Sequence, residues 1–397
     1  MCVSSAFKSF PESLVRGSAE KIEARREPRP TGCAAKFATI GLWALIIFGP
    51  ASKSCGQPIK SQSVKIGVLL PPEEAQSAGI RKGVLLTQEQ AEKIHNIKVE
   101  VVIRGRAGQW GADADEAARM VTDDGVAGLI APPDGAASHL VLQVSGRTAV
   151  PVVTLCGDSS VSRTGVPWMR RVVPRTVDEA QALFQGIPTL VSQKPKRWMA
   201  VVPEGRAGRE RSRDLRQAAS EAHCEFAGAV EVSSTSTHFD LTWQRVMKSH
   251  PDGILIWLGP VPAGEFVRNA RRSGFTGVLA GPSWLDSAGF VAAAHDALEG
   301  FVIPAVVRNM ASTGLFGAFE SAYRTRWGRE PDSMAGMSYD AAMVLIHLNK
   351  AQSQAAPQIV SPDFSESGVT GELSFDAEGN RKLKLELLKG HEGSFVR

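Results

Sequence analysis

Predicted strands and helices alternate in two successive series, and this alternation constrains the fold more than any other feature of the sequence. In the first series, apolar or alternating runs predict strands at residues 64–70, 98–103, 126–131, 150–155 and 168–173, with helices from near Ile80, at 113–123 and at 136–145. The second series predicts strands at 197–202, 226–232, 253–258, 277–280 and 301–305, and helices at 178–191, 209–222, 241–250 and 263–272. Alternation at this pitch favours parallel sheets with right-handed crossovers. The sequence therefore predicts an α/β protein with two doubly wound parallel-sheet lobes.

Length and charge fit this interpretation. The chain has 397 residues, which is enough for two domains. Its formal net charge of +4 is small for that length, and no basic run is interleaved with aromatic residues. A nucleic-acid partner is therefore not expected.

An apolar run near the N-terminus predicts export. Residues 37–48 form about a dozen apolar positions, whereas a membrane span needs roughly 20. Basic residues such as Arg25, Arg26 and Lys36 precede the run, and small residues follow it, as in a secretory signal. Residues 1–55 are thus expected to be an N-terminal extension with a signal segment, and the mature protein extracytoplasmic. A buried helix or a lone membrane anchor is the alternative.

The cysteines carry two further expectations. Cys55 lies where a lipoprotein cysteine would stand, so a lipid anchor there and ordinary cleavage near Ser54 both remain open. Cys156 and Cys224 show no metal-ligand spacing and no dense disulfide framework. We expect them to be free, mostly buried thiols.

The C-terminal region carries a distinctive pattern. Gly368-Val-Thr-Gly371 opens a short alternating stretch that ends at Phe375, residues 376–380 read as a turn, and a second alternating run covers 383–388. Locally this pattern predicts a β-hairpin. It follows predicted helices at 315–327 and 334–350 and a surface loop at 352–362.

Several motifs occur in the order found in one known family. They are residues 64–72 (VKIGVLLPP), Gly79-x-x-x-Gly83, Ala114-x-Glu116-Ala117-Ala118 with residues 125–130, residues 171–174 followed by Asp178-Glu179-Ala180-Gln181, and Ser338-Tyr339-Asp340-Ala341-Ala342 ahead of the C-terminal pattern. Together they cover about residues 64–396. The chain resembles type I periplasmic (solute) binding proteins, in particular the leucine-binding-protein-like receptors of branched-chain amino acid and amide ABC transporters.

The resemblance implies an architecture and a function. The first lobe would comprise residues 62–175 plus 304–367, and the second 176–303 plus 368–397, joined by a multi-strand hinge. An exported, monomeric receptor would capture an amino acid, amide or organic acid between the lobes and deliver it to the permease subunits of an ABC importer. The alternative is an exported sensor of the same fold that signals to a membrane partner.

Enzyme motifs are absent from the sequence. No Gly-x-Gly-x-x-Gly follows the first predicted strand, there is no P-loop, and Gly157-Asp158-Ser159-Ser160 is not a Gly-x-Ser-x-Gly elbow. The histidines are scattered without metal-ligand spacing. No catalytic residue, cofactor or metal is predicted.

Ligand-binding groups in such a fold come from loops at the carboxyl ends of strands. On the resemblance, the candidate residues are Ser138, Gly157, Asp158, Ser159, Arg206, Ser283 and Trp284. The resemblance also implies an acid for a ligand ammonium within residues 281–284, and none stands there. Because a buried ammonium needs an acid or several acceptors, an ordinary zwitterionic amino acid is disfavoured.

Three of these candidates have ordinary structural alternatives. Asp158 would be a turn or cap residue facing solvent. Arg206 would be a solvated loop cation, and Trp284 a core residue of the second lobe.

Overall fold

The computed structural model describes residues 62–72, 74–105, 111–192, 194–233, 236, 238–306, 313–352 and 364–397. The predicted signal segment, Cys55 and all but the first residue of the predicted loop at 352–362 lie outside these residues. None of the described helices is both long and apolar enough to span a membrane.

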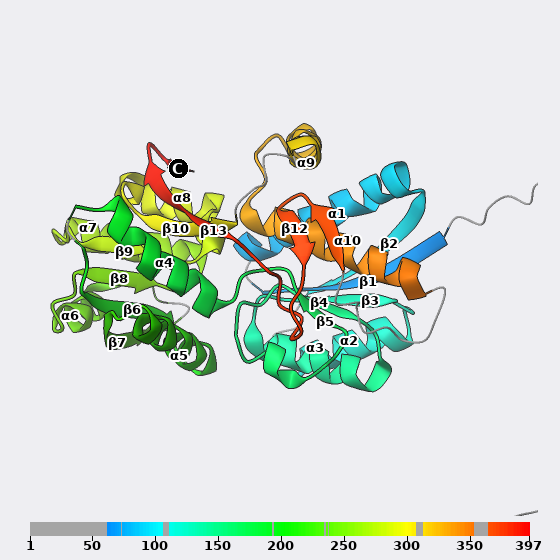
Figure 1. Ribbon diagram of the computed structural model, residues 1–397, viewed down its shortest axis with the longest axis horizontal. Coiled ribbons are helices and arrows are strands. Elements are labelled where there is room, and N and C mark those ends of the chain that lie inside the picture. Colours follow the sequence, from blue (N-terminus) through cyan, green and yellow to red (C-terminus); the bar gives the residue numbers. More distant parts are fainter. Residues whose placement is uncertain are drawn as a thin grey trace, which may run out of the picture. The chain divides into compact units, whose positions relative to one another are not determined.

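The first lobe is a parallel sheet with helices on both faces. Its strands lie in the order β2-β1-β3-β4-β5. Its elements are β1 (Gln62–Leu70), α1 (Glu74–His95), β2 (Ile97–Gly105), α2 (Ala112–Thr122), β3 (Gly128–Ala131), α3 (Gly135–Thr148), β4 (Val152–Thr154), the short helix η1 (Ser162–Thr164), β5 (Met169–Arg171), α9 (Thr313–Trp327) and α10 (Ser333–Gln352). Figure 1 shows α1 and α10 on one side of this sheet and α2 and α3 on the other.

Side-chain alternation along β1 supplies both faces of that sheet. Ile66 and Val68 point into the cluster formed with α1 and α10, whereas Leu69 packs in the cluster formed with α2 and α3. All three side chains are buried. Burial of each such side chain stabilises the fold by roughly 1.5–3 kcal/mol.

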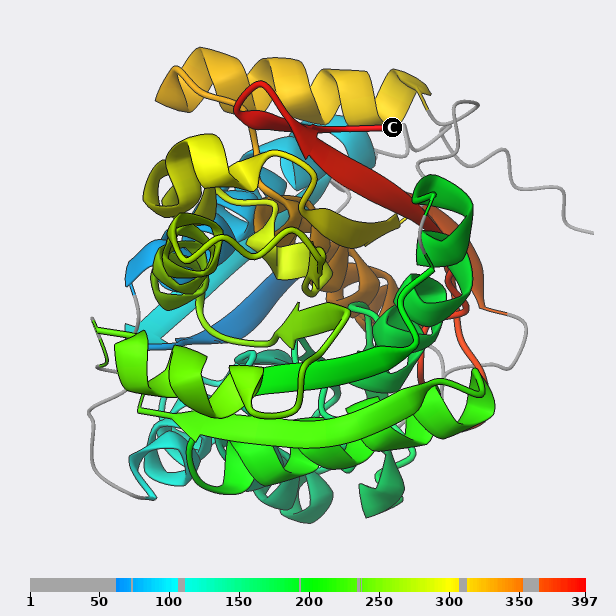
Figure 2. The ribbon, with the colours of Figure 1, turned by 90° about the vertical axis from the view of Figure 1, so that its left-hand side faces the viewer.

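The second lobe is a larger sheet of mixed direction. Its strands lie in the order β14-β13-β10-β9-β8-β6-β7, with β13 antiparallel to both of its neighbours. Its elements are α4 (Thr176–Leu190), β6 (Arg197–Pro203), α5 (Arg206–Glu221), β7 (Glu225–Val232), α6 (Asp240–Met247), β8 (Gly253–Ile256), α7 (Pro260–Arg272), β9 (Val278–Ala280), η2 (Ser283–Leu285), α8 (Ala288–Ala294), η3 (His295–Leu298), β10 (Val302–Val306), β13 (Leu385–His391) and β14 (Ser394–Val396). Figure 2 looks onto this lobe, with the C-terminal strands in red.

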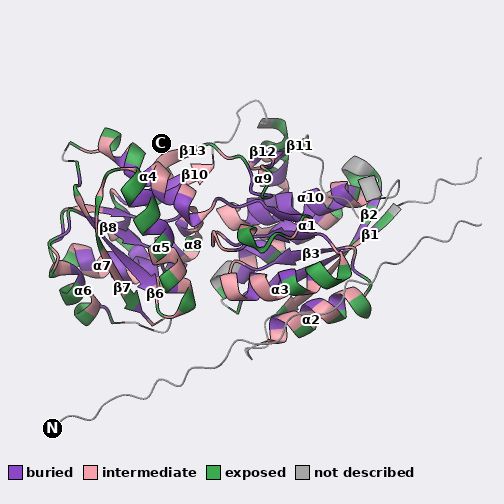
Figure 3. Cartoon of the chain, turned by 60° about the horizontal axis from the view of Figure 1, so that its bottom comes forward, coloured by how far each residue is buried: buried purple, intermediate pink, exposed green. Residues whose placement is uncertain are grey.

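Helices cover this second sheet on both faces. α4 and α5 pack on one face around the buried Trp198, whose ring meets Phe184 edge-on at 5.3 Å. α7 and α8 pack on the other face around Phe266 and Phe290. Figure 3 shows buried residues along the strands of both lobes. The predicted fold class, an α/β protein with two doubly wound lobes, is confirmed.

The predicted C-terminal hairpin is present only beside its turn, where Phe375 and Arg381 form an antiparallel bridge and the Lys382 N–H donates to the Ser374 carbonyl at 2.8 Å. β12 (Gly371–Ser374) pairs with β11 (Ser365–Gly368), which precedes it, so Gly368-Val-Thr-Gly371 is the turn of the actual hairpin. Buried Asp340 holds this turn by accepting the Val369 N–H at 2.8 Å and the Thr370 N–H at 2.9 Å. Glycine is required at 368 because a Cβ there would lie 2.6 Å from Asp340 Oδ1. At 371, φ is +108°, a conformation that other residues resist.

The second alternating run belongs to the other lobe. The predicted turn at 376–380 is present, since the Asp376 N–H donates to the Asn380 carbonyl at 2.8 Å. After this turn the chain continues into the second sheet, where β13 pairs antiparallel with β10. Leu387 and Leu388 pack against clusters on opposite faces of that sheet. A strand that is apolar on both sides is stabilised more inside a covered sheet than in a surface hairpin.

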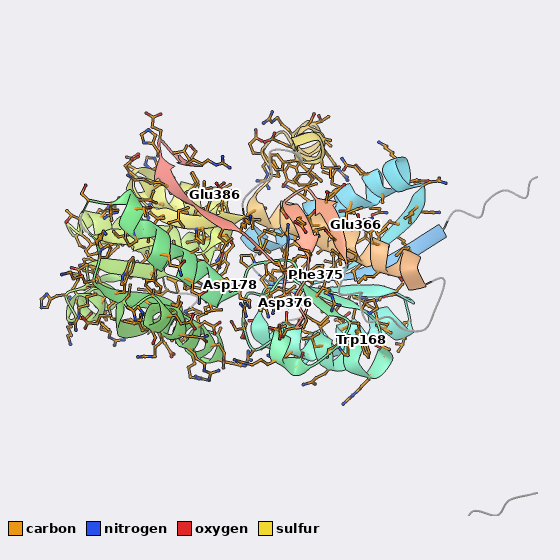
Figure 4. All side chains as sticks on the ribbon, viewed as in Figure 1. Trp168, Asp178, Glu366, Phe375, Asp376 and Glu386 are labelled. Atoms are coloured by element: carbon orange, nitrogen blue, oxygen red, sulfur yellow. The ribbon has the colours of Figure 1, made fainter. Side chains whose placement is uncertain are left out.

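These contacts also displace one predicted lobe boundary. Val369, Leu373 and Phe375 pack in the core of the first lobe, although residues 368–397 were all expected in the second. Figure 4 labels Phe375 and Asp376 beside the first lobe and Glu386 on the second. The chain therefore passes between the lobes after β5, after β10 and before β13. Three strand-end crossings are the arrangement expected for a hinge.

Candidate functional site

Loops at the carboxyl ends of strands from both lobes line a cavity of about 340 Å³. The first lobe contributes loops that follow β1, β3 and β4, and the second contributes loops that follow β6, β8 and β9. This edge of a parallel sheet is where ligands bind in open α/β folds, because the connecting loops diverge there. The cavity is therefore the candidate site.

The loop after β3 is anchored from behind by Ser138. This serine is fully buried, and its hydroxyl donates to the Pro132 carbonyl at 2.8 Å and lies 3.1 Å from Thr154 Oγ1. Ser138 is not among the residues that line the cavity. Asp134 of the same loop does line it, and its carboxylate caps α3 by accepting the Ala137 N–H at 2.8 Å.

The loop after β4 places Gly157 and Asp158 in the cavity wall. Asp158 accepts the Ser160 N–H at 2.8 Å, and its other oxygen lies 3.3 Å from Arg206 Nη1 of the second lobe. Burial alone would raise the pKa of Asp158, but the hydrogen bonds from Ser160 and the charge of Arg206 hold it below its ordinary value. Asp158 is thus a paired carboxylate, and Arg206 is its partner.

Further contacts join the two lobes across the cleft. The Ser159 hydroxyl donates to Asp214 Oδ2 at 2.7 Å, and the Ser333 hydroxyl donates to the Ser283 carbonyl at 3.2 Å. Burial raises the pKa of Asp214. Ser159 is therefore not part of the cavity wall itself, but is bonded to Asp214, which lines the cavity.

Ser283 and Trp284 form part of the wall contributed by the second lobe. The Trp284 indole N–H donates to the Leu258 carbonyl at 3.3 Å, and its ring meets Trp257 edge-on at 6.2 Å. The Arg211 guanidinium lies 5.7 Å from the Trp284 ring. Trp284 thus packs against the core of the lobe and also presents a surface to the cavity.

Sequence reasoning missed Glu179, the most deeply buried acid of the cavity wall. Glu179 is 0% exposed in the first turn of α4, and its Oε1 accepts the Ser283 N–H at 2.8 Å. Burial raises its pKa to about 8. The sequence pattern could have identified this residue, because Glu179 lies on the same helix face as Leu183 and Ile187, which are buried. An acid on the apolar face of a helix is unusual enough to indicate a function.

Carboxyl groups dominate the charged part of the wall. Among the described lining residues, Arg211 is the single base, against seven acids: Asp134, Asp158, Glu179, Glu210, Asp214, Asp286 and Asp332. Burial raises the pKa of Asp332, which caps α10 by accepting the Ala335 N–H at 2.7 Å. The described wall therefore offers an anion one basic side chain, and offers a cation several carboxyl groups that its positive charge would help to ionise.

The described thiols and metal-ligating side chains can be compared with the sequence predictions. Cys156 and Cys224 are free, as predicted. Burial raises the pKa of Cys156 to about 12, so its thiol is a poor nucleophile at neutral pH. Within the described ranges, no group of His, Cys, Asp and Glu side chains is arranged to hold a metal ion.

Two α/β lobes with a cavity between their strand ends define a bilobed binding protein. Residues 63–365 match the family described as periplasmic binding protein, and the chain belongs to that family. The resemblance seen in the sequence is thereby confirmed. No curated protein matches the chain.

Solved structures share the fold at low sequence identity. The leucine binding protein LivK from Thermotoga maritima MSB8 is 21% identical, with a TM-score of 0.74, over 84% of this chain and 97% of that one. LivJ from Streptococcus pneumoniae, in complex with isoleucine, is 18% identical, with a TM-score of 0.72, over 85% and 98%. A solute binding protein of an ABC transporter from Rhodopseudomonas palustris BisB5, in complex with 3,4-dihydroxy benzoic acid, is 16% identical, with a TM-score of 0.71, over 84% and 95%.

Proposed function

We propose that this protein is an exported receptor that captures a small solute in the interlobe cavity and delivers it to an ABC importer. The observation that carries the proposal is the cavity of about 340 Å³ at the strand ends of both lobes. Pockets for small molecules have volumes of roughly 300–1,000 Å³ and join apolar walls to a few placed polar groups. Amino acids, amides and organic acids are within this size range.

The contacts across the cavity support a mechanism of closure. Asp158–Arg206 and Ser159–Asp214 each join one lobe to the other, and the crossings between the lobes supply a hinge. A solute that touches both walls adds contacts in the closed form that the open form lacks. The solute therefore shifts the population toward closure, by as much as its affinity differs between the two forms.

The comparisons support the class of function without fixing the ligand. The family is one of binding proteins, and the similar structures are a leucine binding protein and two binding proteins in complex with isoleucine or 3,4-dihydroxy benzoic acid. Binding of one solute, followed by docking to permease subunits, is the function that we assign to this chain. The proposal includes an extracytoplasmic location after removal of a signal within residues 1–55.

Two experiments test the proposal. Mass spectrometry of the denatured secreted protein identifies any co-purified solute, and thermal shift assays screen amino acids, amides, amines, organic acids and polyols. A folded protein that carries no solute and is stabilised by no compound would contradict the binding function. Delivery is tested by reconstituting a candidate permease and its ATPase in liposomes, where uptake of the solute must require both this protein and ATP.

A further inference from the structure

One buried carboxyl oxygen in the cavity wall lacks a partner. Glu179 is 0% exposed and lines the cavity, and its Oε1 accepts the Ser283 N–H at 2.8 Å. Its other oxygen, Oε2, has no hydrogen-bond partner among the residues that the structure describes. Buried polar atoms are nearly always hydrogen-bonded, because leaving one unpaired costs its desolvation energy. A ligand group in the cavity is the partner that would complete this carboxyl.

Resting on the function proposed above, we propose that Glu179 binds the amino group of the solute and that the cleft selects apolar primary amines without a carboxylate. The acid that binds the ammonium would then come from the first turn of α4. It would not come from residues 281–284, which hold no acid.

The charge of the wall argues for a cation. Glu179 is one of seven carboxyl side chains that line the cavity, whereas Arg211 is the single base among the described lining residues. Arg211 is already engaged, since it donates to the Trp257 carbonyl at 3.0 Å and lies over the Trp284 ring. A solute carboxylate would therefore find few donors, whereas an ammonium would favour ionisation of the carboxyl groups around it, Glu179 included.

The remaining wall argues for an apolar body. Leu155, Val173, Met334, Met337 and Trp284 line the same cavity. Aromatic and thioether side chains accept apolar groups of varied shape, and an aromatic face also attracts a cation. An alkyl or aryl chain attached to the amino group fits this combination of surfaces.

An α-amino acid fits less well than the amine that remains when its carboxylate is removed. Asp158 and Asp214 occupy the side of the cavity between the loop after β4 and helix α5. Asp158 is satisfied by Arg206 and Ser160, and Asp214 by Ser159. A solute carboxylate there would have to break these contacts between the lobes or lie against two acids.

Matched ligands test this selectivity at pH 7 by calorimetry on the intact mature protein. The 3-methylbutyl set is isoamylamine, leucine and 4-methylpentanoate, and the 2-phenylethyl set is phenethylamine, phenylalanine and 3-phenylpropanoate. We expect at least one amine to bind at least tenfold more tightly than its amino acid and its carboxylate. Preference for an amino acid or a carboxylate would overturn this inference and leave the receptor function standing. Binding of no compound here or in the wider thermal screen would count against both.

Variants test the role of Glu179. Glu179→Gln is expected to weaken amine binding at least tenfold, whereas Glu221→Gln, an exposed change on α5 outside the cavity wall, is expected to leave it unchanged. Unaltered amine binding by a folded Glu179→Gln protein would refute the assignment. If that variant does not fold, Glu179→Asp retains the acid but shortens its reach, and the same tenfold criterion applies.

Discussion

The buried carboxyl of Glu179 should make the stability of the protein depend on pH, whether or not a ligand is bound. Its pKa is raised from 4.5 to about 8 by burial in the folded protein. Between these two values the folded state binds more protons than the unfolded state, so this group lowers the free energy of unfolding as the pH rises. The change Glu179→Gln removes the titration. The variant should therefore gain stability relative to the wild type as the pH increases from 5 to 9.

The size of the effect follows from the two pKa values. One pKa unit corresponds to about 1.36 kcal/mol, so the contribution of Glu179 changes by ~4 kcal/mol between pH 5 and pH 9 as an upper limit. Any constant effect of the amide cancels when the two pH values are compared within each variant. Asp214 also has a raised pKa, but it is present in both proteins and cancels too.

Urea denaturation at pH 5 and pH 9 measures the effect, because the free energy of unfolding extrapolates linearly to water. The quantity to compare is the variant's stability minus that of the wild type at each pH. Glu221→Gln, at an exposed site on α5, is the control for a Glu-to-Gln change away from the cavity. A pH-independent difference for Glu179→Gln would show that the carboxyl ionises normally in the folded protein, and the reasoning would be refuted.

Three further predictions concern other parts of the structure. Gly368→Ala should lower the free energy of unfolding by about 1–3 kcal/mol in urea titrations, because the new Cβ would lie 2.6 Å from Asp340 Oδ1. Gly393→Ala, at a turn with open space around it, measures the cost of a positive φ without such a clash. Cys156 should resist iodoacetamide at pH 8 in the native protein and react in urea, because burial raises its pKa to about 12. Mass spectrometry measures the extent of labelling, and rapid labelling of the native protein would contradict this prediction. Amine binding at pH 7 should release about 0.9 proton, because Glu179, with a pKa of about 8, is mostly protonated before an ammonium arrives. Calorimetry in two buffers of different ionisation enthalpy measures the number of protons released. Zero release would exclude ionisation of Glu179 on binding.

The lobes were predictable because their strands are marked by local patterns. The apolar run of β1, with Ile66 and Leu69 on opposite faces, indicates a strand covered on both sides whatever its neighbours are. The pairing of the C-terminal runs was not predictable in the same way. The alternating run at 383–388 predicts a strand, which the structure places at 385–391. The choice of β10 as its partner depends on Leu387 and Leu388, which fill cores built by distant helices.

The candidate site was only partly predictable for a similar reason. Gly157, Asp158, Ser283 and Trp284 line the cavity, since loops at strand ends can be located from the strands themselves. Glu179 was missed because acids are common in the first turn of a helix, where they favour the positive end of its dipole. Its burial depends on packing against the loop that contains Ser283, about a hundred residues further along the chain.

The hairpin β11–β12 and the strands β13 and β14 give the segment 365–396 a role in the order of assembly. It supplies part of the core of one lobe and then an interior strand of the other. Neither core is complete without this segment, so the two lobes share the step that completes them. We expect them therefore to unfold in one cooperative transition.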